Sequence, residues 1–257
     1  EEEASRQGYY WSHRLTVDNV FNPIYTQVVV EAICDPGTND PFVVSSETGS
    51  VFVAASPEEF SYDDDGNILS DGRFNYSWDA ENRLVAVETI EGLPEDMPIV
   101  HVEFAYDYMS RRIGKTVYQW DDGCTNWMQT DSRSFLYDGW LLVQEQSASG
   151  GNVTTNWYIH GIDLSGSLQG AGGIGGLLAA QLGTNSVMYS YDANGNVSEL
   201  LSTSGEIAAH YEYSPFGETT VATGSLADEN KFRFSTKYFD DETGLAYYGY
   251  RYYSPGM

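Results

Sequence analysis

The feature that most constrains the fold of this chain is an aromatic residue followed directly by aspartate, a pair that recurs along the sequence. Each pair is preceded, two residues earlier, by another aromatic residue. Because residues i and i+2 of a strand face the same side, and Asp, Asn and Gly favour turns, each copy predicts a strand, a turn and a second strand. The pairs and their turn glycines are Tyr62-Asp63 with Gly66, Trp78-Asp79, Tyr106-Asp107, Tyr137-Asp138, and Tyr191-Asp192 with Gly195. Such recurrence indicates a repeat protein.

Composition favours the same all-β fold class. Aromatic residues make up 14% of the 257 residues, with 20 Tyr, and the chain has 26 Gly but only 8 Pro. Aromatic residues favour strands, and glycine allows the tight turns that join them. We expect many short strands and no long helix.

The charge of the chain is strongly acidic, with 38 acidic and 12 basic residues and a formal net charge of −26. Such a field repels phosphate groups, so we expect no nucleic-acid partner. No apolar run approaches the roughly 18 residues that span a bilayer, so no membrane insertion is expected. The acidic, lysine-poor composition fits a secreted or salt-exposed protein, and simple solubility explains it equally well.

The pattern divides the chain into four regions. Residues 1–56 are predicted to be a β segment continuous with the sheet, with strands over 14–18 and 26–31 around a turn at Asn22-Pro23, and a dense turn cluster over 35–41. Residues 57–160 hold the repeats, 161–184 form a glycine-rich crossing, and 185–257 form the last region. Since the chain begins with three glutamates, we expect a processed piece or an excised fragment.

Two motifs resemble ligand loops. Residues 170–175 satisfy G-x-G-x-x-G, but no βαβ unit surrounds them, so no dinucleotide cofactor is predicted. The Asp-rich turns after Tyr62 and Tyr191 resemble calcium loops in composition. Gly72 and Leu201 stand where such loops require glutamate, so turn formation explains both better, with weak calcium binding as the alternative.

Other reactive side chains show no catalytic pattern. Asp240, Asp241 and Glu242 are neighbouring carboxylates of the kind that glycosidases use, but they fall in a predicted turn. The four histidines, His13, His101, His160 and His210, lack metal-ligand spacing. No catalytic, metal or cofactor residue is therefore predicted, and the chain is predicted not to be an enzyme. Cys34 and Cys124 are either one bridge or two free thiols.

The end of the chain carries the most specific motif. An Arg-Phe strand, a Tyr-x-Asp-x-Glu-Thr-Gly-Leu turn and an Arg-Tyr-Tyr-x-Pro ending span residues 232–255, and a Tyr-x-Pro-Phe-Gly element precedes them. These segments resemble the repeat-associated core of the RHS, or YD-repeat, proteins. The residues that carry the resemblance are Tyr213, Pro215, Phe216, Gly217, Phe232, Arg233, Phe234, Tyr238, Asp240, Glu242, Thr243, Gly244, Leu245, Tyr250, Arg251, Tyr252, Tyr253 and Pro255.

The resemblance implies a continuous, strongly twisted antiparallel sheet that coils into a spiral or cocoon-like shell. In bacterial polymorphic toxins and toxin complexes of this family, the shell encloses a C-terminal toxin domain. The chain stops before the family's self-cleavage motif. The resemblance therefore implies a non-enzymatic shell or scaffold segment of a secreted or cell-surface protein, with further RHS repeats, copies of itself or an enclosed toxin domain as partners.

Two other functions stay open. Exposed aromatic rows, with Trp78, Trp140 and Trp157 among them, could bind carbohydrate by stacking. The unpaired strand edges of an excised spiral could instead support a self-assembling extracellular filament.

Overall fold

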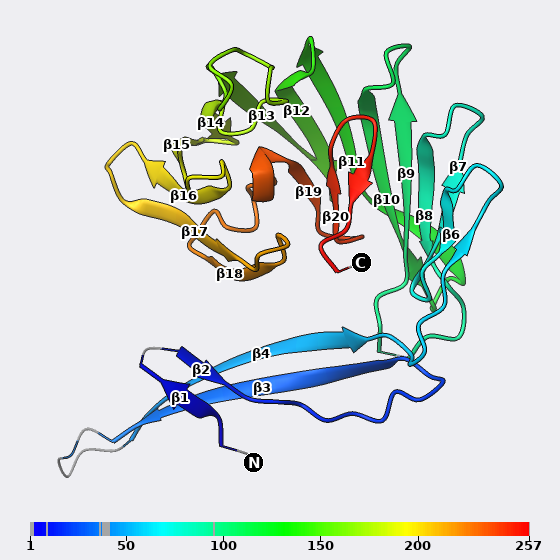
Figure 1. Ribbon diagram of the computed structural model, residues 1–257, viewed down its shortest axis with the longest axis vertical. Coiled ribbons are helices and arrows are strands. Elements are labelled where there is room, and N and C mark those ends of the chain that lie inside the picture. Colours follow the sequence, from blue (N-terminus) through cyan, green and yellow to red (C-terminus); the bar gives the residue numbers. More distant parts are fainter. Residues whose placement is uncertain (1–2, 9, 36, 38–41, 95, 257) are drawn as a thin grey trace. The chain divides into compact units, whose positions relative to one another are not determined.

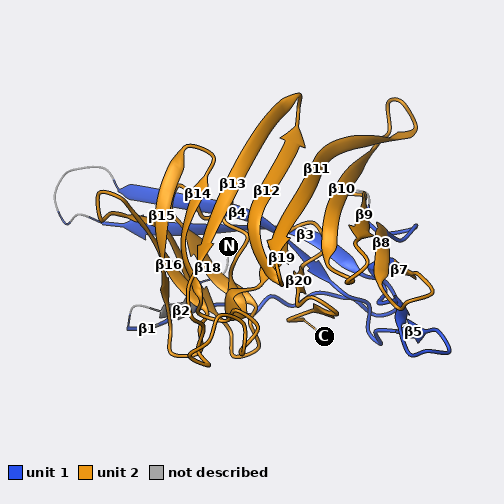
Figure 2. Ribbon diagram, turned by 90° about the horizontal axis from the view of Figure 1, so that it is seen from above, with its two compact units in different colours: residues 1–75, 89–98 blue, residues 76–88, 99–257 orange. Residues whose placement is uncertain are grey.

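The computed structural model describes residues 3–8, 10–35, 37, 42–94 and 96–256 and is almost entirely β. The described residues hold no α-helix, and their single helical element is the 3-10 turn η1 (Phe234–Thr236). They group into two compact units, which Figure 2 distinguishes by colour: residues 1–75 with 89–98, and residues 76–88 with 99–257. The predicted boundary at residue 56 falls inside the first unit, and those at 160 and 184 fall inside the second.

Fourteen strands form one antiparallel sheet in which every strand pairs with the next strand in sequence (Figure 1). The predicted fold class, a continuous antiparallel sheet, is confirmed. The strands are β5 (Ser61–Tyr62), β6 (Ile68–Ser70), β7 (Phe74–Trp78), β8 (Leu84–Thr89), β9 (Val100–Tyr106), β10 (Arg112–Asp121), β11 (Asn126–Asp138), β12 (Leu141–Ser149), β13 (Asn152–His160), β14 (Leu177–Leu182), β15 (Asn185–Tyr191), β16 (Val197–Ser202), β17 (Ile207–Tyr213) and β18 (Thr219–Thr223).

The N-terminal residues differ from the expectation that 1–56 continue this sheet. Their strands form two separate two-stranded sheets, β1 (Ser5–Gln7) with β2 (Tyr10–Ser12) and β3 (Ile24–Cys34) with β4 (Val43–Val53). Between Val53 and Ser61 the only pairing is an isolated bridge of Ser56 with Val20. Pro57 has no amide hydrogen to donate to a ladder, so the strand pairing is interrupted there.

The predicted N-terminal turn is also displaced. Residues 13–19 form no strand, so the strand predicted over 14–18 is wrong: its alternation has no partner strand to pair with. The strand predicted over 26–31 lies within β3, which pairs with β4 from Ile24 opposite Val53 to Cys34 opposite Val43. The hairpin therefore closes with Cys34 opposite Val43, and Asn22-Pro23 is not its turn. Residues 36 and 38–41 of the predicted turn cluster lie outside the described residues.

The aspartates of four aromatic-Asp pairs build the same five-residue turn. The amide of the Asp donates to the carbonyl of the residue four positions on, and its carboxylate accepts the amides two and four positions on; at Asp107 the latter bonds, from Met109 and Arg111, are 2.9 and 3.0 Å long. The fourth residue adopts a left-handed φ, between +56° and +83°, which favours glycine or asparagine. The four aspartates are Asp63, Asp79, Asp107 and Asp192.

The same turn occurs where the sequence shows no aromatic-Asp pair. Asp163 receives the amide of Ser165, and Ser202 and Ser214 accept the amides four positions on through their hydroxyls. This turn therefore needs only a side-chain oxygen at the first position and a residue tolerant of positive φ at the fourth. Asp138 does not form this five-residue turn. It pairs with Leu141 on the next strand, and only Gly139 and Trp140 lie between them.

Four of the turns of the second unit lie along one edge of the sheet, and the turn at Ser202, which follows β16, lies on the other. Consecutive antiparallel strands run in opposite directions, so every second connection returns to the same edge. The turns at Asp79, Asp107, Asp192 and Ser214 follow β7, β9, β15 and β17, all of which run the same way. Connections of other lengths, such as residues 90–99 after β8, fall on the opposite edge. This alternation explains why the aromatic-Asp pairs recur at irregular spacings.

Three tyrosines at strand ends join neighbouring repeats. The Tyr106 hydroxyl donates to the carbonyl of Leu84 at 2.6 Å, and the Tyr213 hydroxyl donates to that of Val197 at 2.8 Å. Each acceptor is the residue that directly follows the preceding Asp turn. Tyr137 makes the equivalent bond to Arg112 at 3.0 Å. We call these bonds the tyrosine links; each connects one repeat to the repeat before it.

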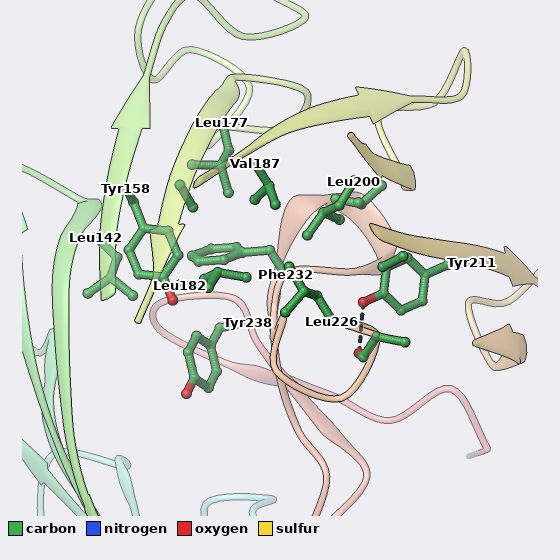
Figure 3. Packing of buried hydrophobic residues seen from close by; sticks show 14 of the residues in the cluster. Leu142, Tyr158, Leu177, Leu182, Val187, Leu200, Tyr211, Leu226, Phe232 and Tyr238 are labelled. Atoms are coloured by element: carbon green, nitrogen blue, oxygen red, sulfur yellow. Dashed lines mark hydrogen bonds between the residues drawn. The ribbon is translucent and has the colours of Figure 1, made fainter. Parts of the chain in front are cut away.

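The inner face of the curved sheet in the second unit holds the hydrophobic core. Figure 3 shows Tyr158 of β13, Phe232 and Tyr238 turned toward one another, and the ring centroids of Tyr158 and Phe232 are 5.0 Å apart. The Tyr211 hydroxyl donates to the carbonyl of Ala227 at 2.8 Å. Strand residues and the C-terminal segment thus share one core.

Replacing Asp107 by alanine removes the acceptor of two turn amides and the partner of Arg111. We expect the free energy of unfolding to fall by about 1–2 kcal/mol, measured by urea denaturation. Asp138→Ala is the control, because this exposed carboxylate accepts no hydrogen bond from the described residues, and a change below about 0.5 kcal/mol is expected. Equal losses in the two variants would contradict the turn-forming role of Asp107.

Candidate functional site

The C-terminal segment, residues 232–253, lies on the concave side of the curved sheet of the second unit (Figure 1). Its strands β19 (Tyr238–Asp240), β20 (Leu245–Tyr247) and β21 (Tyr252–Tyr253) form a small antiparallel sheet of their own. The Asp240 carbonyl accepts the amides of Thr243 and Gly244 and closes the turn between β19 and β20. A segment far along the chain is thereby packed against strands β9 to β13.

A buried ionic contact joins this segment to strand β10. Asp240 Oδ2 accepts from Arg112 Nη1 at 2.5 Å, and Asp240 Oδ1 accepts from Lys115 Nζ at 2.9 Å. The Lys115 ammonium also donates to Glu242 at 2.7 Å. Asp240 is 0% exposed, Arg112 1% and Lys115 2%. Two cations and one carboxylate are therefore removed from water together.

The Arg112 guanidinium lies inside a cage of aromatic rings. Its Nε has no hydrogen-bond partner among the residues described, and ring faces surround the group. Aromatic faces attract a desolvated cation, and guanidinium stacks on them more readily than ammonium does. The five ring centroids lie 4.6 to 5.8 Å from Arg112 Cζ and belong to Phe104, Phe135, Tyr238, Tyr247 and Tyr252.

A second buried carboxylate, Glu145 of β12, is fully satisfied by hydrogen bonds. Its Oε1 accepts from Arg133 and from the Tyr238 hydroxyl, both at 2.6 Å, and its Oε2 accepts from the Tyr158 hydroxyl at 2.7 Å. Asn156 adds a longer bond of 3.3 Å. Glu145 therefore binds Tyr238, the first residue of β19. Asp240, the last residue of β19, binds β10 through its own carboxylate. We call Arg112, Lys115, Arg133, Glu145 and Asp240 the anchor cluster.

Both carboxylates of the anchor cluster stay ionised well into acid. Burial alone would raise the pKa, but Arg112 and Lys115 outweigh it and hold the pKa of Asp240 below its ordinary value of 3.8. Arg133 and the tyrosine hydroxyls likewise hold the pKa of Glu145 below 4.5. Paired and hydrogen-bonded charge is what allows ionised groups to remain buried.

The other C-terminal signature residues pack around the same segment. Arg233 pairs with Asp241 at 3.1 Å and lies over the ring of Phe239. The ring of Phe234 stacks on that of Tyr253 and lies against Gly217, where a Cβ would come within 2.6 Å of it. The Phe216 carbonyl accepts the Tyr253 hydroxyl, Tyr250 packs on Trp140, the Arg251 carbonyl accepts the Tyr248 amide, and Tyr252 bonds Tyr106. The remaining members are Pro215, Leu245 and Pro255.

The sequence interpretation missed Arg112, Lys115 and Glu145, which carry the anchor cluster. A signal for them exists. In β10 and β12 they occupy buried positions among apolar buried residues such as Val117, Leu141 and Leu142. A charged residue at an inward position implies a partner, because burial of an unpaired charge is costly. The sequence interpretation treated Asp240 as a turn residue alone. In the structure its side chain also pairs with two cations, Arg112 and Lys115.

The candidate ligand loops use their polar groups internally. Asp63 accepts the Asp65 and Asn67 amides, as Asp192 does with its own loop, so these oxygens serve the turn. In the G-x-G-x-x-G segment the amides of Ala171 and Gly173 donate to the Asp163 carboxylate. This glycine-rich nest thus holds a carboxylate of its own chain where a phosphate would sit in a nucleotide site.

The structure also locates the cysteines and two of the tryptophans that the sequence singled out. Across the described ranges, no group of three or more His, Cys, Asp or Glu gathers as a metal site, and no described helix is long and apolar enough to cross a membrane. Cys34 and Cys124 are exposed free thiols. Trp140 packs on Tyr250 and Trp157 is an exposed residue of β13, so these two indoles belong to different surroundings.

Comparison with known proteins shows sequence similarity to a nuclease and to a deaminase toxin. No protein-family model matches it. The tRNA3(Ser)-specific nuclease WapA of Bacillus spizizenii is 34% identical over 199 residues, 77% of this chain and 7% of that protein. Double-stranded DNA deaminase toxin A of Burkholderia cenocepacia is 27% identical over 212 residues, 77% of this chain and 14% of that protein. The chain therefore spans a small fraction of the length of its curated relatives.

Solved structures show the same fold. The crystal structure of TcdB2-TccC3 matches with a TM-score of 0.54 and 18% identity, covering 90% of this chain and 12% of the other. At this identity the likeness shows the fold alone. The chain therefore has a toxin-related, RHS-like all-β fold. The comparisons give no support to carbohydrate binding or filament assembly.

Two predictions need correction. The relatives are named as a nuclease and a deaminase toxin, which are enzymes, so the prediction of a non-enzyme is contradicted. The tRNA and DNA in those names also count against the predicted absence of a nucleic-acid partner. Both predictions were based on side chains and charge within this chain, which corresponds to 7% of the nuclease. The chemistry of a longer protein is not visible in such a segment.

Replacing Asp240 by asparagine leaves Arg112 and Lys115 buried with one fewer opposing charge. We expect a loss of about 3–5 kcal/mol in the free energy of unfolding, measured by urea denaturation. Asp241→Asn is the matched control, because Asp241 is an exposed neighbour paired with Lys231 and Arg233, and should cost below about 1 kcal/mol. Similar losses in both variants would show that burial of the pair is unimportant.

The depressed pKa of Glu145 predicts a pH dependence of stability. A carboxylate with a folded-state pKa below its unfolded value of 4.5 contributes fully above that value, and the contribution is lost as pH falls through the folded pKa. The difference in melting temperature between the wild type and Glu145→Gln should be constant from about pH 7 to 5 and shrink below about pH 4. Taking this difference removes the effect of the other acidic groups. A difference that grows on acidification would contradict the assignment.

Proposed function

We propose that this chain is a wall segment of an RHS shell in a secreted bacterial toxin, with residues 185–257 as its repeat-associated core. In this proposal the shell encloses a C-terminal effector, and the nuclease or deaminase chemistry named for the relatives comes to the longer toxin as an activity on nucleic acid. Identity over 77% of this chain supports the toxin relationship. Because the aligned part is a small fraction of each relative, activity, substrate and partners are all part of the proposal.

The observation that carries the proposal is the attachment of the C-terminal segment to the concave side of the sheet. Asp240 joins that segment to β10 through buried ion pairs with Arg112 and Lys115. The Tyr238 hydroxyl of the segment donates to Glu145 of β12 and accepts from Arg133 of β11. The C-terminal end lies on the same side (Figure 1). A polypeptide that followed it would begin inside the curve of the wall, where an enclosed effector has to be.

The acidic composition fits such a container. With a net charge of −26, the wall repels nucleic acid and attracts basic proteins. Enzymes that act on nucleic acid bind phosphate groups through Lys and Arg, so their binding surfaces are basic. An acidic shell is therefore electrostatically suited to hold an effector of the class named for the relatives.

The test uses the full-length gene product. We expect electron microscopy to show a hollow particle, and limited proteolysis to leave a C-terminal fragment intact. Asp240→Asn should loosen the attached segment and speed cleavage of that fragment at least about tenfold, given the cost of breaking a buried pair. Asp241→Asn should leave the rate near that of the wild type. A solid particle, or a C-terminal region digested as fast in the wild type as in Asp240→Asn, would refute the enclosure.

A further inference from the structure

A cavity of about 290 Å³ lies within the second unit, and Tyr238 and Tyr247 of the cage around Arg112 are among its lining residues. The ring of Trp140, the rings of Tyr248 and Tyr250, and the backbone of the glycine-rich loop at Gly172 line it, together with His160 and other residues. Its size is at the lower limit of small-molecule sites, which suits a ligand with a single ring. Tyr250 is 71% exposed, so one wall of the cavity reaches the surface.

One cation in this cavity has no carboxylate partner. Lys237 Nζ donates to the Gly172 carbonyl at 2.5 Å and lies 5.4 Å from the centroid of the Tyr248 ring. No ion pair of Lys237 occurs in the described part of the chain, whereas Lys115 pairs with two carboxylates and Lys231 with one. In a chain with 38 acidic and 12 basic residues, an ammonium without an acidic partner is unusual.

One carboxylate acts on Lys237 electrostatically, but its oxygens bond other groups. Asp163 is the acidic group that acts on Lys237, but its oxygens accept from Ser165, Ala171 and Gly173. Burial lowers the pKa of Lys237, since the ammonium loses contact with water. An anion that entered the cavity would restore a partner to this group through a charge-assisted hydrogen bond.

A second polar group of the cavity lacks a partner. The Nε2 of His160 is 2.8 Å from the carbonyl of Leu142, so this nitrogen must carry the proton and donate. Burial lowers the pKa of His160 and favours the neutral ring. Nδ1 is then an acceptor, and it is buried with no donor from the residues that the structure describes. A hydroxyl group is the ligand feature that would satisfy it.

We propose that this cavity binds a small ring carboxylate that also carries a hydroxyl group. The Lys237 ammonium binds the carboxylate, the Nδ1 of His160 accepts from the hydroxyl, and the rings of Trp140 and Tyr248 pack on the ligand ring. A sugar acid and a hydroxylated aromatic acid share this chemistry, and the two are separated by experiment. The proposal is independent of the shell function.

The test titrates the chain with glucuronate and with 4-hydroxybenzoate by isothermal calorimetry. Glucose and 4-hydroxybenzyl alcohol are the matched neutral ligands, and each should bind at least about tenfold more weakly than its acid, because the charge-assisted bond is absent. Binding of glucuronate identifies the sugar-acid source, and binding of 4-hydroxybenzoate the aromatic one. Failure of both acids to bind overturns the proposal.

Two variants locate the site. Lys237→Met removes the ammonium while keeping an unbranched chain, and should weaken binding of the acid at least about tenfold. Lys231→Met also removes one charge from the C-terminal region but lies on an exposed ion pair with Asp241, and should change affinity less than about twofold. Equal effects of the two variants, or none, overturn the assignment.

A measurement on the wild-type chain covers the case in which Lys237→Met fails to fold. Lysine acetylation followed by mass spectrometry reports the modification rate of each lysine. The bound acid should slow acetylation of Lys237 at least about tenfold, as expected if its ammonium is paired, and leave Lys231 unchanged. Equal rates with and without the acid at Lys237 contradict the site.

Discussion

The buried contact between Arg112 and Asp240 is the interaction on which the second unit depends. The side chain of Arg112 binds Asp240 within a cage of five rings, its amide donates to the Tyr247 hydroxyl, and its carbonyl accepts the Tyr137 hydroxyl. One residue of β10 therefore connects its own strand, the next repeat and the C-terminal segment. Few other positions in the described chain unite contacts so far apart in sequence.

The buried ion pairs in this core indicate what fixes the position of the C-terminal segment on the sheet. A buried ion pair contributes little net stability compared with apolar residues of similar volume. It does define register, because a hairpin displaced by one residue would leave cations without partners. Tyrosine and phenylalanine side chains alone would tolerate several positions of β19 on the sheet. Asp240 and Glu145 select one, which holds the C-terminal segment in a single place.

Much of the fold could be predicted from local chemistry, while the anchor cluster could not. The Asp turns are visible in sequence because an oxygen and a left-handed fourth residue lie within five positions, as at Asp107. The turns at Asp163 and Ser202 escaped notice because the pattern sought an aromatic residue that the turn itself does not need. Arg112 and Asp240 are 128 positions apart, and nothing local to either names the other.

The tyrosine links have a consequence for how such chains change over evolution. Each tyrosine link reaches the residue that follows the preceding turn, so these bonds join adjacent repeats. Duplicating or deleting one whole repeat would recreate the same bond at the new junction. Loops on the opposite edge can lengthen without disturbing any of these bonds. The length of the sheet can therefore change by whole repeats while the tyrosine link at each junction stays the same.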